Sequence, residues 1–202
     1  YVSAGLLEAA RCAGYSTGAL KPVAAGCEDT PGGLRNDDAL LLQQQCTLPL
    51  SYEQINPVAL ALPVAPHIAA AMEGRRLDVE RLLGFCRGVL SQHAELTIIE
   101  GAGGWRVPLN GRETLADLPR RLGVPVILVV GMRLGCINHA LLTAEAIRAD
   151  GLEIAGWVAN HVATIGSSSA SAVLLELVRN RHAPAALVLH EPDAILLLGL
   201  IV

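Results

Sequence analysis

Residues 125–149 read PVILVVGMRLGCINHALLTAEAIRA, and this stretch decides the fold class. Its first six residues, Pro125 to Val130, form an apolar run of strand length, which predicts a strand buried on both faces. A glycine-containing turn follows, and Cys136 to Ala149 is expected to form a helix. A buried strand that leads into a helix is typical of a parallel sheet covered by helices.

The same alternation continues on both sides of this stretch. Further strands are expected at Ser16–Lys21, Leu96–Glu100, Ile154–Ala159 and Ala186–Leu189. Further helices are expected at Val2–Ala13, Asn36–Gln45, Pro66–Glu73, Asp78–Gln92, Thr114–Leu122 and Ser169–Arg179. We therefore predict one α/β domain over residues 1–202, with an open, mostly parallel sheet and helices on both faces. Ligands of such sheets bind beyond the carboxyl ends of the strands.

Composition excludes several classes of function. Of the 202 residues, 52% are hydrophobic and 17% are charged, which excludes a disordered chain. A net charge of −4 offers no field for nucleic acid or anionic lipid. No apolar run reaches the roughly 18–20 residues that a membrane span needs. The cysteines number five, with no CxxC pair, so we expect neither disulfides nor a zinc site, and a cytoplasmic location.

Two charged residues end predicted strands. Glu100 ends the segment LTIIE, in which three residues are apolar, and precedes the turn Gly101–Gly104, a pattern that nucleotide enzymes use to hold Mg²⁺ near phosphates. Lys21 precedes Pro22 and could neutralise phosphate or carboxylate oxygens as a point charge. Either residue could instead be a charged group that merely ends a strand. The glycine turn after Glu100 favours the functional interpretation there, whereas for Lys21 the two interpretations are evenly balanced.

Other polar residues leave alternatives open. Asp37 and Asp38 begin a helix, where interaction with the helix dipole is a sufficient explanation; a metal role requires Glu100 nearby. Asn160 follows a strand and could recognise a base edge or cap a turn.

The segment Leu134 to His139 lies between the PVILVV strand and a predicted helix, and the free N–H groups at the start of that helix could bind an anion. Cys136 and His139 do not suggest a thiol nucleophile, because no third group orients the pair.

The chain resembles one known family over roughly residues 2–165. The resemblance rests on successive blocks in the family's order: GALKPVAAG, GLRNDDALLL, INPVALALPVAPHIAA, IIEGAGGWRVPL, PVILVVGMRLGCINHALLTAEAI and IAGWVAN. These look like dethiobiotin synthetase, a family of the P-loop NTPase superfamily. EGAGGW and LGCINHAL are the most specific blocks in combination.

The resemblance implies a reaction and a set of roles. In the family, 7,8-diaminononanoate takes up CO₂ as a carbamate, ATP phosphorylates the carbamate, and the second amine closes a ureido ring, with Mg²⁺ required. Lys21 would neutralise the carbamate and the transferred phosphoryl group, and Asp38 and Glu100 would hold Mg²⁺. The remaining implied roles are phosphate and substrate contact by Gly103 and Gly104, adenine recognition by Asn160, a substrate contact at Ala25, and binding of the substrate carboxylate across a homodimer interface by Gly135, Cys136, Ile137 and Asn138.

The sequence also departs from the family pattern. The family opens with a strand and a GTxTxVGKT-like loop, whereas these 202 residues contain no GxxxxGK[ST] motif. We therefore expect impaired ATP turnover by this polypeptide, and unpaired strand edges at the centre of its sheet. The match to the family fades after Ala183. A non-catalytic dimeric binding protein derived from this family is the alternative. A P-loop enzyme of the amidating or partitioning type is disfavoured by EGAGGW and LGCINHAL.

Overall fold

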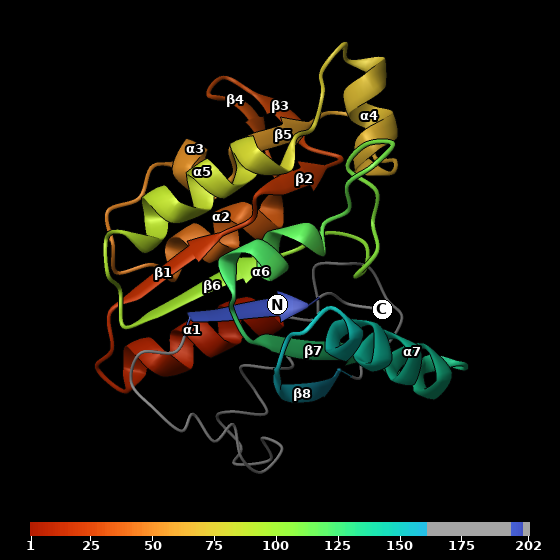
Figure 1. Cartoon of the computed structure of the whole chain (residues 1–202). Coiled ribbons are helices and arrows are strands. Elements are labelled where there is room, and N and C mark those ends of the chain that lie inside the picture. The colour runs from red at the N-terminus through yellow and green to blue at the C-terminus, as the bar shows by residue number, and fades with distance from the viewer. Residues whose placement is uncertain (161–194, 200–202) are drawn as a thin grey trace.

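A computed structural model describes residues 1–160 and 195–199 and contains a parallel five-stranded sheet (Figure 1). Its strand order is β1-β6-β9-β7-β8. The strands are β1 (Thr17–Leu20), β6 (Leu96–Glu100), β9 (Ile195–Gly199), β7 (Val126–Gly131) and β8 (Ile154–Asn160). Every paired neighbour in this sheet is parallel, which confirms the predicted fold class.

Helices pack against the strands as the alternating pattern predicts. They are α1 (Val2–Cys12), α2 (Asp37–Gln44), α3 (Tyr52–Ile55), α4 (Pro66–Met72), α5 (Val79–Leu90), α6 (Asp117–Leu122) and α7 (Cys136–Ala149). Helices α1 and α2 contact each other and β1, α5 contacts β1 and α6, and α7 contacts β7 and β8. None of the described helices is long and apolar enough to cross a membrane.

The buried strands explain why the apolar runs were informative. All four residues of β1 and the first five of β7 are buried, as expected for strands covered on both faces. Leu7 of α1, Leu42 of α2 and Ile147 of α7 belong to the main hydrophobic cluster with Ile98 and Ile127 of the sheet.

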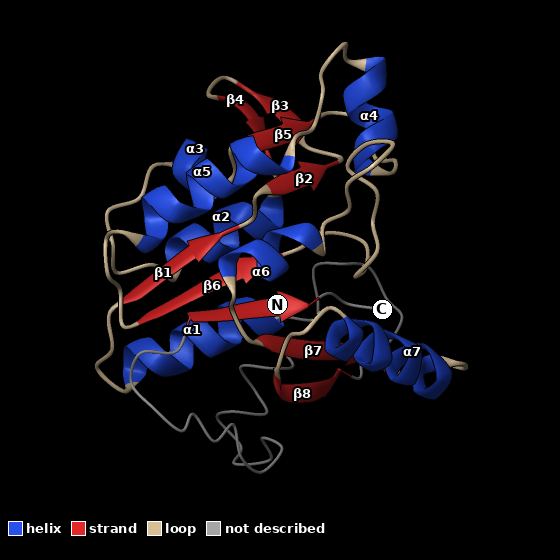
Figure 2. Ribbon diagram, in the orientation of Figure 1, coloured by secondary structure: helices blue, strands red, loops and turns tan. Residues whose placement is uncertain are grey.

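Two smaller sheets extend the molecule beyond β1 (Figure 2). Strands β2 (Val23–Ala25) and β5 (Val58–Leu60) are parallel, and β3 (Glu28–Thr30) and β4 (Gly33–Arg35) form an antiparallel hairpin. The sequence did not predict these strands or α3, because segments of three or four residues are too short to show a period. A second hydrophobic cluster joins Leu60 of β5 to Leu82 of α5.

Two expectations are wrong. Helix α6 begins at Asp117 rather than Thr114, because Thr114 forms a bridge with Pro108 and donates its N–H to Asp117 Oδ2 at 2.7 Å. The centre of the sheet does not have unpaired edges, since β9 pairs with β6 on one side and β7 on the other. The helix expected at Ser169–Arg179 and the strand expected at Ala186–Leu189 lie outside the described residues.

Candidate functional site

A cavity of about 540 Å³ lies at the carboxyl ends of β1 and β6, where parallel sheets bind ligands. Val64, Pro66 and Val129 contribute apolar wall. Polar groups reach the cavity from α1, the end of β1, the start of α2 and the end of β6; they include Ser3, Lys21, Asn36, Asp38 and Glu100.

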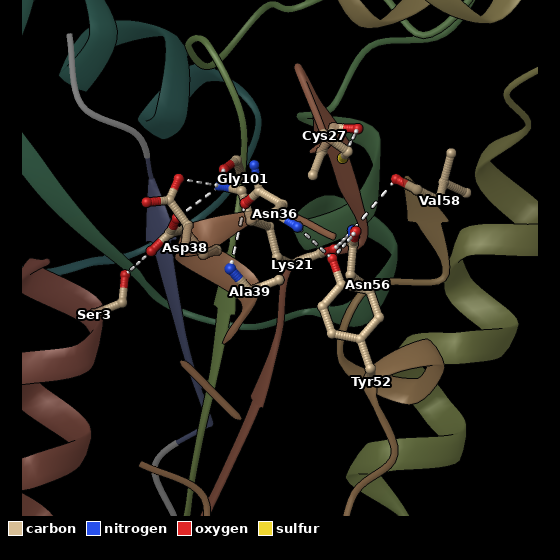
Figure 3. Close-up of polar contacts among 12 residues, drawn as sticks. Ser3, Lys21, Cys27, Asn36, Asp38, Ala39, Tyr52, Asn56, Val58 and Gly101 are labelled. Carbon is tan, nitrogen blue, oxygen red and sulfur yellow. Dashed lines mark hydrogen bonds and ion pairs between the residues drawn. The ribbon is translucent and has the colours of Figure 1, made fainter. Parts of the chain in front are cut away.

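Lys21 lies at the centre of the polar contacts (Figure 3). The residue is only 6% exposed, and its Nζ donates to Glu100 Oε1 at 2.7 Å and to the Gly101 carbonyl at 3.3 Å. Asp38 Oδ2 lies 3.4 Å from the same nitrogen. Ser3 donates its hydroxyl hydrogen to the other carboxylate oxygen of Glu100. The structure therefore brings Lys21, Asp38 and Glu100 together from three separate segments.

Both members of the buried pair remain charged. Burial disfavours the charged form of Lys21, but the attraction of Glu100 and Asp38 outweighs burial and raises the pKa of Lys21 above its ordinary value. Burial likewise favours a neutral Glu100, yet the charge of Lys21, with hydrogen bonds from Lys21 and Ser3, lowers the pKa of Glu100 below its ordinary value. The cavity thus contains a fixed cation and a fixed anion.

The donor set at this point fits Mg²⁺ bound partly by protein. Since Asp38 Oδ2 and Glu100 Oε1 both lie close to Lys21 Nζ, at 3.4 and 2.7 Å, they are no more than about 6 Å apart. Carboxylates are hard oxygen ligands, and Mg²⁺ commonly takes one or two of them with water and phosphate oxygens. Among the described residues, no three His, Cys, Asp or Glu side chains gather as a complete metal cage. These residues would therefore supply part of a Mg²⁺ shell.

The glycine turn after β6 lies at the cavity edge. Gly103 and Gly104 have φ angles of 75° and 133°, which side chains with a Cβ rarely adopt. Gly103 lines the cavity, whereas Gly104 does not. Trp105, which follows the turn, donates its indole N–H to Asp150 Oδ2 at 2.7 Å and so anchors the turn to the end of α7.

The other predicted residues divide into two groups. Ala25 lines the cavity with Lys21. Asn160, at the end of β8, and the segment Gly135–Asn138 are not part of the cavity lining. Gly135 begins α7 in the left-handed conformation, with φ 89°, and no side chain caps the helix. Within the described part of the chain, the N–H groups of Ile137 and Asn138 have no acceptor, so the expected open helix start is present but outside this cavity.

Sequence reasoning missed some contacts that build the site. Ser3 lies in an ordinary helical pattern, and nothing in that pattern indicated a contact with Glu100. Tyr52 and Asn56, which contact the backbone around Asp38 and Lys21, also carried no signal of their own. Asn36 was predicted as a helix cap, and its side chain does accept from the Ala39 N–H at 3.3 Å.

Comparison with known proteins assigns the chain to a family. Residues 1–188 match a family model described as an AAA domain. The ATP-dependent dethiobiotin synthetase BioD of Cellvibrio japonicus is 67% identical over 159 residues, which are 79% of this chain and 69% of that protein. The proteins of the same name from Pseudomonas aeruginosa PA14 and, as BioD 1, Escherichia coli O157:H7 are 63% and 51% identical, covering 80% and 83% of this chain and 71% and 74% of theirs.

The chain belongs to the dethiobiotin synthetase family. Membership confirms the family and the P-loop NTPase class that the sequence blocks predicted. It also sets aside an enzyme of the amidating or partitioning type. In this chain, the central feature of the cavity is a buried cation between two carboxylates.

The buried pair gives a testable energetic signature. We expect Glu100→Gln to lower the free energy of unfolding by about 3 kcal/mol, because it leaves the Lys21 charge buried with one carboxylate partner instead of two. The double variant Lys21→Met, Glu100→Gln should be more stable than Glu100→Gln alone, since the incompletely compensated buried charge is gone. Urea denaturation at neutral pH measures both effects.

Glu80→Gln is the matched control for this comparison. Glu80 pairs with Arg121, but the two side chains are 61% and 42% exposed, so the change should cost less than about 1 kcal/mol. If Glu100→Gln and Glu80→Gln lowered the free energy of unfolding equally, the Lys21–Glu100 pair would contribute no more to stability than an exposed ion pair.

Proposed function

We propose that this chain is an ATP- and Mg²⁺-dependent ligase that carboxylates 7,8-diaminononanoate with CO₂ and closes the ureido ring of dethiobiotin. One observation carries the proposal: a buried lysine lies between two carboxylates in a cavity at the strand ends of a chain of this family. The relatives are named ATP-dependent dethiobiotin synthetases, which supports ATP as the co-substrate.

Lys21 is the residue to which we assign the main catalytic role. An ammonium group has three N–H donors, and in this structure Glu100, Gly101 and Asp38 occupy its surroundings. Asp38 is the longer contact, at 3.4 Å, and its side chain is 46% exposed. We therefore expect an incoming carbamate or phosphoryl oxygen to replace Asp38 at Lys21, while Glu100 continues to hold the ammonium. Preorganised positive charge of this kind stabilises charge that develops on transferring groups.

Asp38 and Glu100 are the residues that would hold Mg²⁺. Bound there, the ion would neutralise phosphate charge. Release of Asp38 from Lys21 leaves its carboxylate free for this role, and the hydrogen bond from Ser3 keeps Glu100 oriented.

The other roles follow the family resemblance. Gly103 and Gly104 would contact phosphate or substrate, and Ala25 would contact substrate from the cavity wall. Asn160 would recognise adenine. We also propose a reducing, cytoplasmic compartment, because the five cysteines show no disulfide or zinc-site spacing in the sequence.

Turnover by the 202-residue polypeptide is expected to be slow. The sequence contains no GxxxxGK[ST] motif, which in P-loop enzymes supplies backbone N–H groups, a lysine and a hydroxyl around the phosphates. Loss of a single preorganised donor commonly costs about 10²–10³ in rate. We therefore expect diamine- and CO₂-dependent ATP hydrolysis at least about 10²-fold slower than in a chain that carries a strand and GTDTEVGKT ahead of Tyr1.

Lys21→Met in the longer chain is the companion variant. It should reduce turnover by a further factor of about 10² or more if the ammonium stabilises the transferred group. Comparable turnover by the two chains would show that the phosphate site is misplaced. Binding of the diamine without turnover by either chain would favour the alternative, a non-catalytic dimeric binding protein.

We also propose a homodimer in which Gly135, Cys136, Ile137 and Asn138 of one subunit bind the substrate carboxylate at the other subunit's cavity. An apolar stripe supports this arrangement: Leu134, Ile137 and Leu141 are 105%, 74% and 60% exposed. Ile137 and Leu141 are four residues apart and so lie on one side of α7, and Leu134 lies two residues before the helix begins. The start of α7, next to these residues, has no side-chain cap and so could bind an anion. It does not line the cavity of the same subunit.

Sedimentation tests the proposed dimer. We expect a dimer at micromolar concentration, and we expect Leu141→Glu to produce monomers because it places a charge in the apolar stripe. Met72→Glu is the control: Met72 is 69% exposed on α4, away from the stripe, so this variant should remain dimeric. A monomeric parent chain, or a dimer unaffected by Leu141→Glu, would contradict the proposed interface.

A further inference from the structure

The segment Ser51–Asn56, which contains α3, contacts the backbone of the site residues without lining the cavity (Figure 3). Here it is called the α3 clamp. Three contacts link it to the site, two to Lys21 and one to the residue that caps the Asp38 helix.

The backbone of Lys21 depends on the α3 clamp. Lys21 lies between β1 and β2, which belong to different sheets, so its peptide groups have no strand partner. Its N–H donates to the Ile55 carbonyl at 2.7 Å, and its carbonyl accepts from Asn56 Nδ2 at 2.6 Å. Buried backbone groups require such partners, so these two bonds fix the point from which the Lys21 side chain starts.

The same clamp holds the helix that carries Asp38. The Tyr52 hydroxyl accepts from the Asn36 N–H at 2.7 Å and donates to Asn56 Oδ1 at 3.2 Å. Asn36 is the N-cap of α2, and Asp38 is the second residue of that helix. Tyr52 and Asn56 therefore join the start of α2 to the carbonyl of Lys21 through an unbroken series of hydrogen bonds.

The clamp is itself rigidly held. Ser51 and Gln54 form a reciprocal capping box at the start of α3. Tyr52 and Asn56 are 7% and 3% exposed, and the Arg35 guanidinium lies 4.1 Å from the centre of the Tyr52 ring. A buried network whose members are all hydrogen bonded is stiff, because any displacement leaves a buried polar group unpaired.

We propose that Tyr52 and Asn56 are positioning residues that set the spacing between the Lys21 ammonium and the Asp38 carboxylate. The inference deepens the proposed function, because it concerns the step in which Asp38 exchanges its place at Lys21 for an oxygen of the substrate. A shift of α2 relative to Lys21 would change how readily that exchange occurs. An ordinary core network would contribute stability but would not control this one contact.

A double-substitution experiment distinguishes a positioning role from an ordinary stabilising role of Tyr52 and Asn56. The ¹⁵N chemical shift of the Lys21 ammonium is measured by NMR with and without Asp38→Asn, first in the parent chain and then in Tyr52→Phe and Asn56→Ala. In the parent chain, Asp38→Asn removes an ion-pair partner at 3.4 Å and should move the resonance. In both clamp variants the same substitution should move it by less than about half as much, because the two groups are no longer held together.

Matched controls address simple loss of stability. Tyr15→Phe removes an exposed hydroxyl far from the clamp in sequence, and Asn110→Ala removes side-chain bonds to Leu77 and Glu113 that do not involve Lys21. Both controls should retain the full Asp38→Asn response, even where Asn110→Ala lowers the unfolding free energy. Because Tyr52→Phe keeps the aromatic ring beside Arg35, we expect this variant to fold even if Asn56→Ala does not.

The outcomes are distinguishable from those of the proposed function. A full Asp38→Asn response in Tyr52→Phe would overturn the positioning role, whatever the enzyme does. A reduced response confined to the clamp variants would support it, and this readout needs no turnover. If the chain gave this result but failed every ring-closure assay, the positioning role would stand and the proposed activity would be wrong.

Discussion

The burial of one positive charge governs the organisation of this protein. Lys21 is 6% exposed in a chain that is 52% hydrophobic, and an uncompensated ammonium in such surroundings would lose its proton or destabilise the fold. Glu100 and Asp38 prevent both outcomes by raising the pKa of the ammonium. Ser3 from α1 donates to Glu100, and the Gly101 carbonyl in the glycine turn after β6 accepts from Lys21. Residues from distant segments therefore all contribute to compensating one charge.

The two carboxylates lie at different distances from the Lys21 ammonium and differ in exposure. Glu100 is close to Lys21 and nearly buried, whereas Asp38 is more distant and half exposed. This asymmetry is what a site needs if one carboxylate is to hold the lysine permanently and the other is to give way to substrate. The open start of α7 lies outside the cavity, together with an exposed apolar stripe, and the proposed dimer accounts for both features with one interface.

The sequence predicted those features that depend on local pattern. The runs ending at Glu100 and Val130 are apolar because their strands are covered on both faces, and Asn36 has the chemistry of a helix cap. Features that depend on distant segments were not accessible. The proximity of Asp38 and Glu100 was predicted from the family resemblance, since sequence spacing alone cannot show that two distant segments lie together. Insertion of β9 between β6 and β7 was not foreseen, because a short apolar tail does not reveal its pairing partner.

The central claim is that Lys21, Asp38 and Glu100 form one functional unit that accepts Mg²⁺, and NMR can test it directly. The measurement follows the ¹³C resonances of both carboxylates and the ¹⁵N resonance of the Lys21 ammonium during titration with Mg²⁺. The account predicts that all three resonances move together and report a single dissociation constant, because Mg²⁺ binding must draw Asp38 away from Lys21. Movement of only one carboxylate, or of neither, would contradict it.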